Sequence, residues 1–208
     1  MGLASLLFQD PVAFLLLTIP LLYSVILHEV SHGWVAYLFG DDTAKRTGRL
    51  SLNPLVHLDP MGTLALFLVG FGWAKPVPVV YSNLRNFRVG LICVSLAGCV
   101  TNITVATISI LLLQFKAITA NPVLTMVLAV MTKINIILGA FNLIPIPPLD
   151  GSRILYGLLP SKGQSVLAKI EPYGLLIIFA LLFTGILNPI IMSTQNTIMA
   201  FIRFMLKI

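Results

Sequence analysis

The chain has 208 residues, of which 58% are hydrophobic and 10% charged, and its mean hydropathy is +0.99. Soluble domains carry roughly 25% charged residues, so this composition excludes an ordinary soluble protein and predicts a polytopic membrane protein. The net charge of +6 does not indicate a nucleic-acid partner, because the basic residues cluster in loops between apolar segments, as the positive-inside rule expects. We expect a single membrane-embedded domain over residues 1–208, surrounded by the lipid bilayer.

The first apolar segment contains a short polar run, His28-Glu29-Val30-Ser31-His32. We predict one long spanning helix over residues 12–39, with this run in its second half. Residues four apart lie on one helix face, so both imidazoles can bind one metal ion, and H-E-x-x-H is the helical zinc-hydrolase motif. Glu29 is then the general base that takes a proton from a zinc-bound water. The alternative is two histidines that only satisfy hydrogen bonds, but ionisable groups in a membrane segment are costly and mark functional sites.

The segments that follow alternate between basic loops and apolar stretches. Lys45, Arg46 and Arg49 place the end of the first helix in the cytoplasm, and the N-terminus therefore outside. Residues 49–60 favour a short strand and turns. Residues 61–74 are uncharged but too few for an ordinary span, which is more typical of a re-entrant or interfacial element. The glycines at positions 62, 70 and 72 do not favour a plain helix. A re-entrant piece beside a buried metal can hold an extended substrate by strand addition.

Two further spans complete the predicted core. Residues 89–115 are uncharged and predict a span that runs outward, and residues 122–146 predict one that runs back inward. Lys133 lies near the middle of this third span, where it either lines a water-filled cavity or snorkels toward the membrane surface. These spans predict an all-α polytopic membrane protein.

The C-terminal part is predicted to add two transmembrane helices. Residues 172–202 are uncharged, and Asn188-Pro189 divides them into two halves. We expect a helical hairpin over about residues 172–206.

Asp150 is the favoured third metal ligand. A catalytic zinc usually has three protein ligands, and the two histidines leave one to be found. Asp150 follows the proline-rich end of the third span, which approaches the same membrane face as the histidines. We expect the prolines to hold Asp150 on non-helical backbone that can bend toward the metal. Its alternative role is a helix or turn cap beside Gly151. His57 is the rival ligand, although it lies in a loop outside the spans.

These motifs together resemble those of the site-2 protease family of intramembrane metalloproteases. The similarity covers about residues 20–155 and is to the minimal branch of that family, which lacks a PDZ domain. It rests on the H-E-x-x-H run and on these further motifs: Leu52-Asn53-Pro54, Asp59-Pro60-Met61-Gly62, Gly72-Trp73-Ala74-Lys75-Pro76-Val77-Pro78-Val79, Gly98-x-x-x-Asn102, and Asn142 with Pro148-Leu149-Asp150-Gly151.

The resemblance implies a zinc metalloendopeptidase that hydrolyses peptide bonds in or near the transmembrane segments of substrate proteins. It implies a three-helix core over about residues 11–155 and a membrane re-entrant β element around residues 49–80. It implies one zinc ion (Zn2+) on His28, His32 and Asp150, with Glu29 as general base. It places Asn102 near the substrate or the oxyanion, and Asn142 near the substrate. We expect a multi-pass protein of the cell membrane whose active site faces the cytoplasm. A metal-ion transporter is the rival function, but it should show ligands staggered along a path, often with repeated halves. This chain has one set of ligands at one depth and no repeat.

Overall fold

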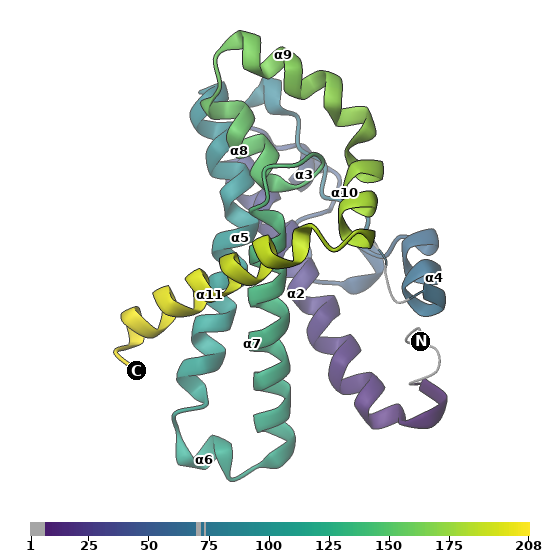
Figure 1. The fold of residues 1–208 in the computed structure, drawn as a ribbon, viewed down its shortest axis with the longest axis vertical. Helices are drawn as coiled ribbons and strands as arrows, with labels where there is room; N and C mark the ends of the chain where they lie inside the picture. The colour runs from purple at the N-terminus through teal and green to yellow at the C-terminus, as the bar shows by residue number, and fades with distance from the viewer. Residues whose placement is uncertain (1–6, 70–71, 73) are drawn as a thin grey trace.

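The computed structural model describes residues 7–69, 72 and 74–208. Within these residues the regular elements are helical (Figure 1), with 3-10 helices written η. In chain order they are α2 (Pro11–Leu38), α3 (Thr43–Arg46), η1 (Pro54–Val56), α4 (Pro60–Val69), η2 (Tyr81–Asn83), α5 (Phe87–Leu112), α6 (Lys116–Thr119), α7 (Pro122–Asn142), α8 (Asp150–Leu158), α9 (Ser161–Ile170), η3 (Glu171–Tyr173), α10 (Gly174–Phe183) and α11 (Leu187–Leu206).

Helix α2 is the long first helix that the sequence predicts. Asp10 caps it by accepting a 3.0 Å hydrogen bond from the backbone N–H of Ala13, which satisfies one of the donors that a helix start leaves free. The helix continues through Pro20. It is followed by Gly40, whose φ of +108° is a left-handed conformation that glycine adopts without steric cost. The polar run therefore lies in the second half of one continuous helix.

Helices α2, α5 and α7 pack against one another. Helix α5 contacts α7, α2 and α8, and α2 also contacts α7. In Figure 1, α5 and α7 run side by side and are joined through α6 at one end, while α3, α8 and α9 gather at the opposite end. The approach of α2 to α5 requires a glycine at position 98, because a Cβ atom there would lie 2.3 Å from Cε1 of His28. The His28 ring is thus pressed against the backbone of α5.

Four stretches of the described chain are long and apolar enough to cross a membrane, which makes this an integral membrane protein. They are Pro11–Leu38, Phe87–Leu112, Pro122–Asn142 and Ser161–Phe183. The first three coincide with the core spans that the sequence predicts. The predicted C-terminal hairpin of two spans is supported only in its first half, because α11 is not among the four. Its hydropathy is lowered by its polar residues, namely Asn188, Ser193, Thr194, Gln195, Asn196, Thr197 and Arg203.

The structure does not support the predicted re-entrant β element. Between residues 49 and 80, the described residues form one isolated antiparallel bridge, Leu58 to Ala74, and the helix α4. The prediction counted the glycines of residues 61–74 against a helix. Gly62 lies in the first turn of α4 and the other two follow its last residue, so they leave the leucine-rich middle free to form a helix. At 1.5 Å per residue, α4 is about 15 Å long, roughly half the thickness of a membrane core.

Candidate metal centre

The two histidines of α2 converge because they are one helical turn apart. His28 and His32 are both buried, and their Nε2 atoms lie 3.1 Å from each other. Their rings meet edge to face, with centroids 4.7 Å apart and an angle of 83° between the planes. The two nitrogens therefore point at a common space on the face of α2 that meets α5.

Asp150 brings a carboxylate into the same space from the far end of the core. Its Oδ2 lies 3.1 Å from Nε2 of His28 and 3.3 Å from Nε2 of His32. The proline-containing segment between α7 and α8 delivers it, and a Cβ atom at Gly151 would lie 2.3 Å from the carbonyl oxygen of Leu143. The prediction expected Asp150 on non-helical backbone, whereas it is the first residue of α8.

The dimensions of this cluster fit a zinc ion. Zinc bonds to histidine nitrogen and carboxylate oxygen are roughly 2.0–2.2 Å long, so two ligands of a tetrahedral ion lie about 3.3–3.6 Å apart. The three separations here are 3.1, 3.1 and 3.3 Å. In addition, Oδ2 of Asp150 is buried without a hydrogen-bond partner among the described residues, which is costly unless a cation satisfies it. Two histidines and one carboxylate are a ligand set of catalytic zinc, with the fourth position left for water.

The second nitrogen of each imidazole has an acceptor. Nδ1 of His28 lies 2.6 Å from Oδ1 of Asn102, and Nδ1 of His32 lies 2.7 Å from the carbonyl oxygen of Val94. With protons on the Nδ1 atoms, the lone pairs of both Nε2 atoms face the cluster, which is how outer hydrogen bonds orient metal-binding histidines.

Glu29 lies next to His28 but outside the three-residue cluster. Its Oε2 accepts a 3.0 Å hydrogen bond from the backbone N–H of Val77. The segment that carries Val77 is fixed at its N-terminal end by Arg49, which donates to the carbonyl oxygens of Lys75 and Pro76, at 2.6 and 3.1 Å. One oxygen of Glu29 is thus held by a donor of fixed position.

The other end of this segment is fixed by Asp41. Its Oδ2 accepts a 2.7 Å hydrogen bond from the backbone N–H of Val80, and its Oδ1 accepts one from the side chain of Asn83. Burial alone would raise the pKa of Asp41, but its hydrogen bonds from Thr43, Asn83 and Val80 outweigh that effect, and the pKa lies below its usual value. Asp41 therefore stays ionised and keeps residues 75–80 against α2.

The remaining predicted residues lie elsewhere. His57 is fully buried, and its Nε2 hydrogen-bonds the carbonyl oxygen of Ser51 at 2.7 Å, so it serves its own loop. Asn142, at the end of α7, donates to the carbonyl oxygen of Leu138 one turn earlier. Asn102 is fully buried and touches His28 rather than an open surface. Lys133 lines a second cavity, between α7 and α11, together with Gln195 and Asn196.

Two residues of the core network escaped the sequence analysis. Asn135 is fully buried and binds the amide of Asn102, and Ser24 is fully buried and binds Asn135. A signal for both was present. Ser24 lies four residues before His28, on the same helix face, and Asn135 is an amide inside a predicted span.

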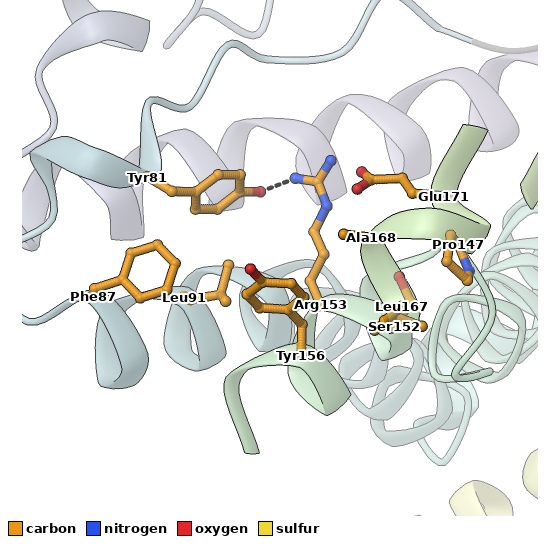
Figure 2. Close-up of a pocket in the computed structure, with 10 residues that line it drawn as sticks. All are labelled: Tyr81, Phe87, Leu91, Pro147, Ser152, Arg153, Tyr156, Leu167, Ala168 and Glu171. Carbon is orange, nitrogen blue, oxygen red and sulfur yellow. Dashed lines mark hydrogen bonds between the residues drawn. The ribbon is translucent and has the colours of Figure 1, made fainter. Parts of the chain in front are cut away.

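A cavity of about 250 Å³ lies against α8, the helix that begins with Asp150. Figure 2 shows the guanidinium of Arg153 between the hydroxyl of Tyr81, to which it donates a hydrogen bond, and the carboxylate of Glu171. Burial lowers the pKa of Arg153, while the charges of Glu171 and Glu29 oppose that shift. The residues that line the cavity are mostly apolar or aromatic: Tyr81, Phe87, Leu91, Pro147, Ser152, Arg153, Tyr156, Leu167, Ala168 and Glu171.

Two histidines and a carboxylate around one point, with a glutamate beside them and helices that can cross a membrane, are typical of a zinc-dependent hydrolase embedded in a membrane. Comparison with known proteins agrees. The chain is 37% identical over 187 residues to the Bacillus subtilis protein named "Putative zinc metalloprotease YwhC", which covers 86% of this chain and 85% of that protein. The family model described as Peptidase family M50 matches residues 109–185.

Other relatives carry similar names. The chain is 33% identical over 180 residues to "Putative zinc metalloprotease Rip2" of Mycolicibacterium smegmatis, covering 84% of this chain and 69% of that protein. It is 27% identical over 154 residues to "Zinc metalloprotease MJ0392" of Methanocaldococcus jannaschii, covering 74% of this chain and 37% of that protein. No solved structure matches the chain significantly. The chain belongs to peptidase family M50, the site-2 protease family, and is a zinc metalloprotease, which confirms the predicted family, enzyme class and cofactor.

Proposed function

We propose that this protein hydrolyses peptide bonds in or near transmembrane segments of other proteins, with zinc held by His28, His32 and Asp150. The observation that carries the proposal is the meeting of three ligand atoms, all within 4.8 Å of one another, two of them on a helix that is long and apolar enough to cross a membrane. A helical substrate hides its carbonyl groups in its own hydrogen bonds, so a substrate segment that is already partly unwound is the expected target.

Glu29 is the general base in this proposal. Zinc, when bound, polarises the scissile carbonyl group and makes water more acidic. Glu29 accepts the proton of the attacking water and delivers it to the leaving amide nitrogen. Because Val77 occupies Oε2, the proton is carried on Oε1. The hydrogen bond from Val77 also prevents rotation of the carboxylate, which keeps Oε1 directed at the reacting atoms.

The cavity against α8 is the proposed site for one side chain of the substrate. It adjoins the cluster because Arg153 lies one turn after Asp150 on α8, and the charge of Glu29 acts on Arg153. Its aromatic walls favour a bulky apolar side chain, as in other small-molecule and peptide pockets. Asn142 is partly exposed at the end of α7 and stays our candidate for a contact to the substrate backbone.

The proposed orientation places the active site at the cytoplasmic side of the cell membrane and the N-terminus outside. Helices α3, α8 and α9 gather at one end of the molecule (Figure 1), and each carries basic residues. Basic loops favour the cytoplasm. Asp150, at the start of α8, then lies toward that side and gives water a short route to the cluster.

The test is cleavage of a panel of single-span proteins by the purified enzyme, with and without a zinc chelator. Glu29→Gln should abolish cleavage and retain zinc, because Glu29 is assigned as base and not as ligand. His28→Ala should lose both. Zinc loss in Glu29→Gln would place Glu29 among the ligands, and cleavage that resists both the chelator and Glu29→Gln would refute the proposal.

A further inference from the structure

A continuous chain of hydrogen bonds leads from His28 into the apolar core. Oδ1 of Asn102 lies 2.6 Å from Nδ1 of His28, and Nδ2 of Asn102 donates to Oδ1 of Asn135 at 2.7 Å. Nδ2 of Asn135 in turn donates to Oγ of Ser24 at 2.8 Å. Asn102, Asn135 and Ser24 are each completely buried, and the chain joins α5, α7 and α2.

Two backbone carbonyl groups end this chain. Nδ2 of Asn135 also donates to the carbonyl oxygen of Met131 at 2.8 Å, and Oγ of Ser24 donates to that of Pro20 at 2.6 Å. A backbone carbonyl can only accept a hydrogen bond. The Met131 carbonyl therefore requires the NH2 end of the Asn135 amide, and the Pro20 carbonyl takes the hydroxyl proton of Ser24.

These fixed ends set the direction of every bond between them. Since the NH2 end of Asn135 faces Met131, its oxygen faces Asn102 and must receive a proton from it. The Asn102 amide is thereby turned with its oxygen toward His28. An amide oxygen can only accept, so Nδ1 of His28 carries the proton. The second nitrogen, Nε2, is left with its lone pair pointing at Asp150 and His32.

We propose that Asn135 and Ser24 are positioning residues that hold His28 in the one tautomer able to bind zinc. The inference rests on the proposed role of His28 as a ligand. His32 needs no such device, because its Nδ1 faces the backbone carbonyl of Val94 directly. Because Nδ1 of His32 does not depend on Asn102 or Asn135, the His32 tautomer serves as a control for that of His28 in the same protein.

Without the Asn135 amide, the direction of these hydrogen bonds should no longer be fixed. The Asn102 amide could then rotate and offer its NH2 end to Nδ1 of His28, which moves the imidazole proton to Nε2 and blocks the metal position. Changes in the partners of metal-binding histidines lower metal affinity by about 10- to 100-fold. The alternative is that these hydrogen bonds only hold three helices together, as buried amides do in membrane proteins. In that case, loss of the Asn135 amide should lower the stability of the protein and leave the His28 tautomer unchanged.

The test measures the His28 tautomer and zinc binding in the full-length protein in detergent. The tautomer is read from imidazole nitrogen NMR shifts in the zinc-free protein, assigned with single histidine variants. The zinc dissociation constant is measured by competition with a chelator. Asn135→Leu should shift His28, but not His32, toward the Nε2-protonated form and weaken zinc binding by about 10- to 100-fold.

Three variants separate tautomer control from packing. Thr132→Val is the matched control, because Thr132 is a buried polar residue of the same helix that donates only to the carbonyl oxygen of Leu128. It should leave the tautomer and zinc affinity unchanged. Asn135→Asp, neutral in this apolar site, keeps an acceptor for Asn102 and a donor for Ser24, so it should restore zinc binding relative to Asn135→Leu. Ser24→Ala should have a smaller effect, since Met131 still orients Asn135.

A lower unfolding temperature in Asn135→Leu, with the wild-type tautomer and zinc affinity, would refute the inference and leave the chain as a helix-packing network. If Asn135→Leu does not fold, the comparison of Asn135→Asp and Ser24→Ala with wild type decides by the same two measurements. Failure of the proposed function is distinct: wild type would bind zinc through other residues, so that His28→Ala keeps its affinity, or would bind zinc through His28 and cleave nothing.

Discussion

The backbone N–H of Val77 donates a 3.0 Å hydrogen bond to Oε2 of Glu29 across 48 positions of sequence. Each neighbour of Val77 is a proline, which restricts the backbone on both sides. The donor is therefore part of a rigid segment, and the proposed base is aligned by backbone rather than by another flexible side chain.

Replacing Val77 by proline removes this donor while the residue stays apolar. We expect kcat to fall by about 100-fold, the size of effect that a misplaced catalytic group produces, with zinc content unchanged. Val77→Ala is the control, because it shortens the buried side chain but keeps the N–H. Equal activity of the two variants, measured on one purified substrate, would show that the hydrogen bond does not align Glu29.

Asp150→Ala should lower zinc affinity and remove activity. Three protein ligands are usual for catalytic zinc, and only Asp150 supplies a carboxylate oxygen beside the two histidines in the described chain. His57→Ala and Asp59→Ala should keep the metal, since His57 bonds Ser51 and Asp59 accepts from the N–H of Gly62. Zinc content and cleavage are measured on the same preparations. Full zinc occupancy in Asp150→Ala would contradict the assignment.

Filling the cavity against α8 should weaken substrate binding and leave the metal in place. Ala168→Trp puts a large ring at the wall of the cavity, and we expect KM to rise by about tenfold with kcat little changed, the pattern of lost uniform binding. Val166→Trp is the matched control, because Val166 is exposed on the same helix and does not line the cavity. An unchanged KM in Ala168→Trp would exclude this cavity as a substrate site.

The orientation in the membrane can be tested with single cysteine labels in a variant without Cys93 and Cys99. Labels at positions 45 and 85 should both react from the cytoplasmic side, and a label at position 119 should react from outside. The segment between the first two positions contains α4, about half a membrane thick at 1.5 Å per residue. Labelling of positions 45 and 85 from opposite sides would mean that this segment crosses the membrane.

The sequence by itself determined what depends on local order. Helical periodicity puts His28 and His32 on one face and Glu29 beside them, and uninterrupted apolar length marks the three core helices. Both properties depend only on residues that are close together in the sequence. The same reasoning failed for residues 61–69, which it did not predict as a helix and which lie in α4. For α11, an uncharged stretch alone is a weak basis for a span, because polar residues lower the hydropathy of this helix.

Only the tertiary structure decided which distant groups meet. In a transmembrane helix the residues that face lipid and those that face protein are equally apolar, so the hydrophobic pattern does not fix how one helix is rotated or shifted against the next. Depth in the membrane was enough to favour Asp150 over His57 as the third metal ligand. The hydrogen bond from Val77 to Glu29, and those that connect Ser24 through Asn135 and Asn102 to His28, depend on how the helices are rotated and shifted.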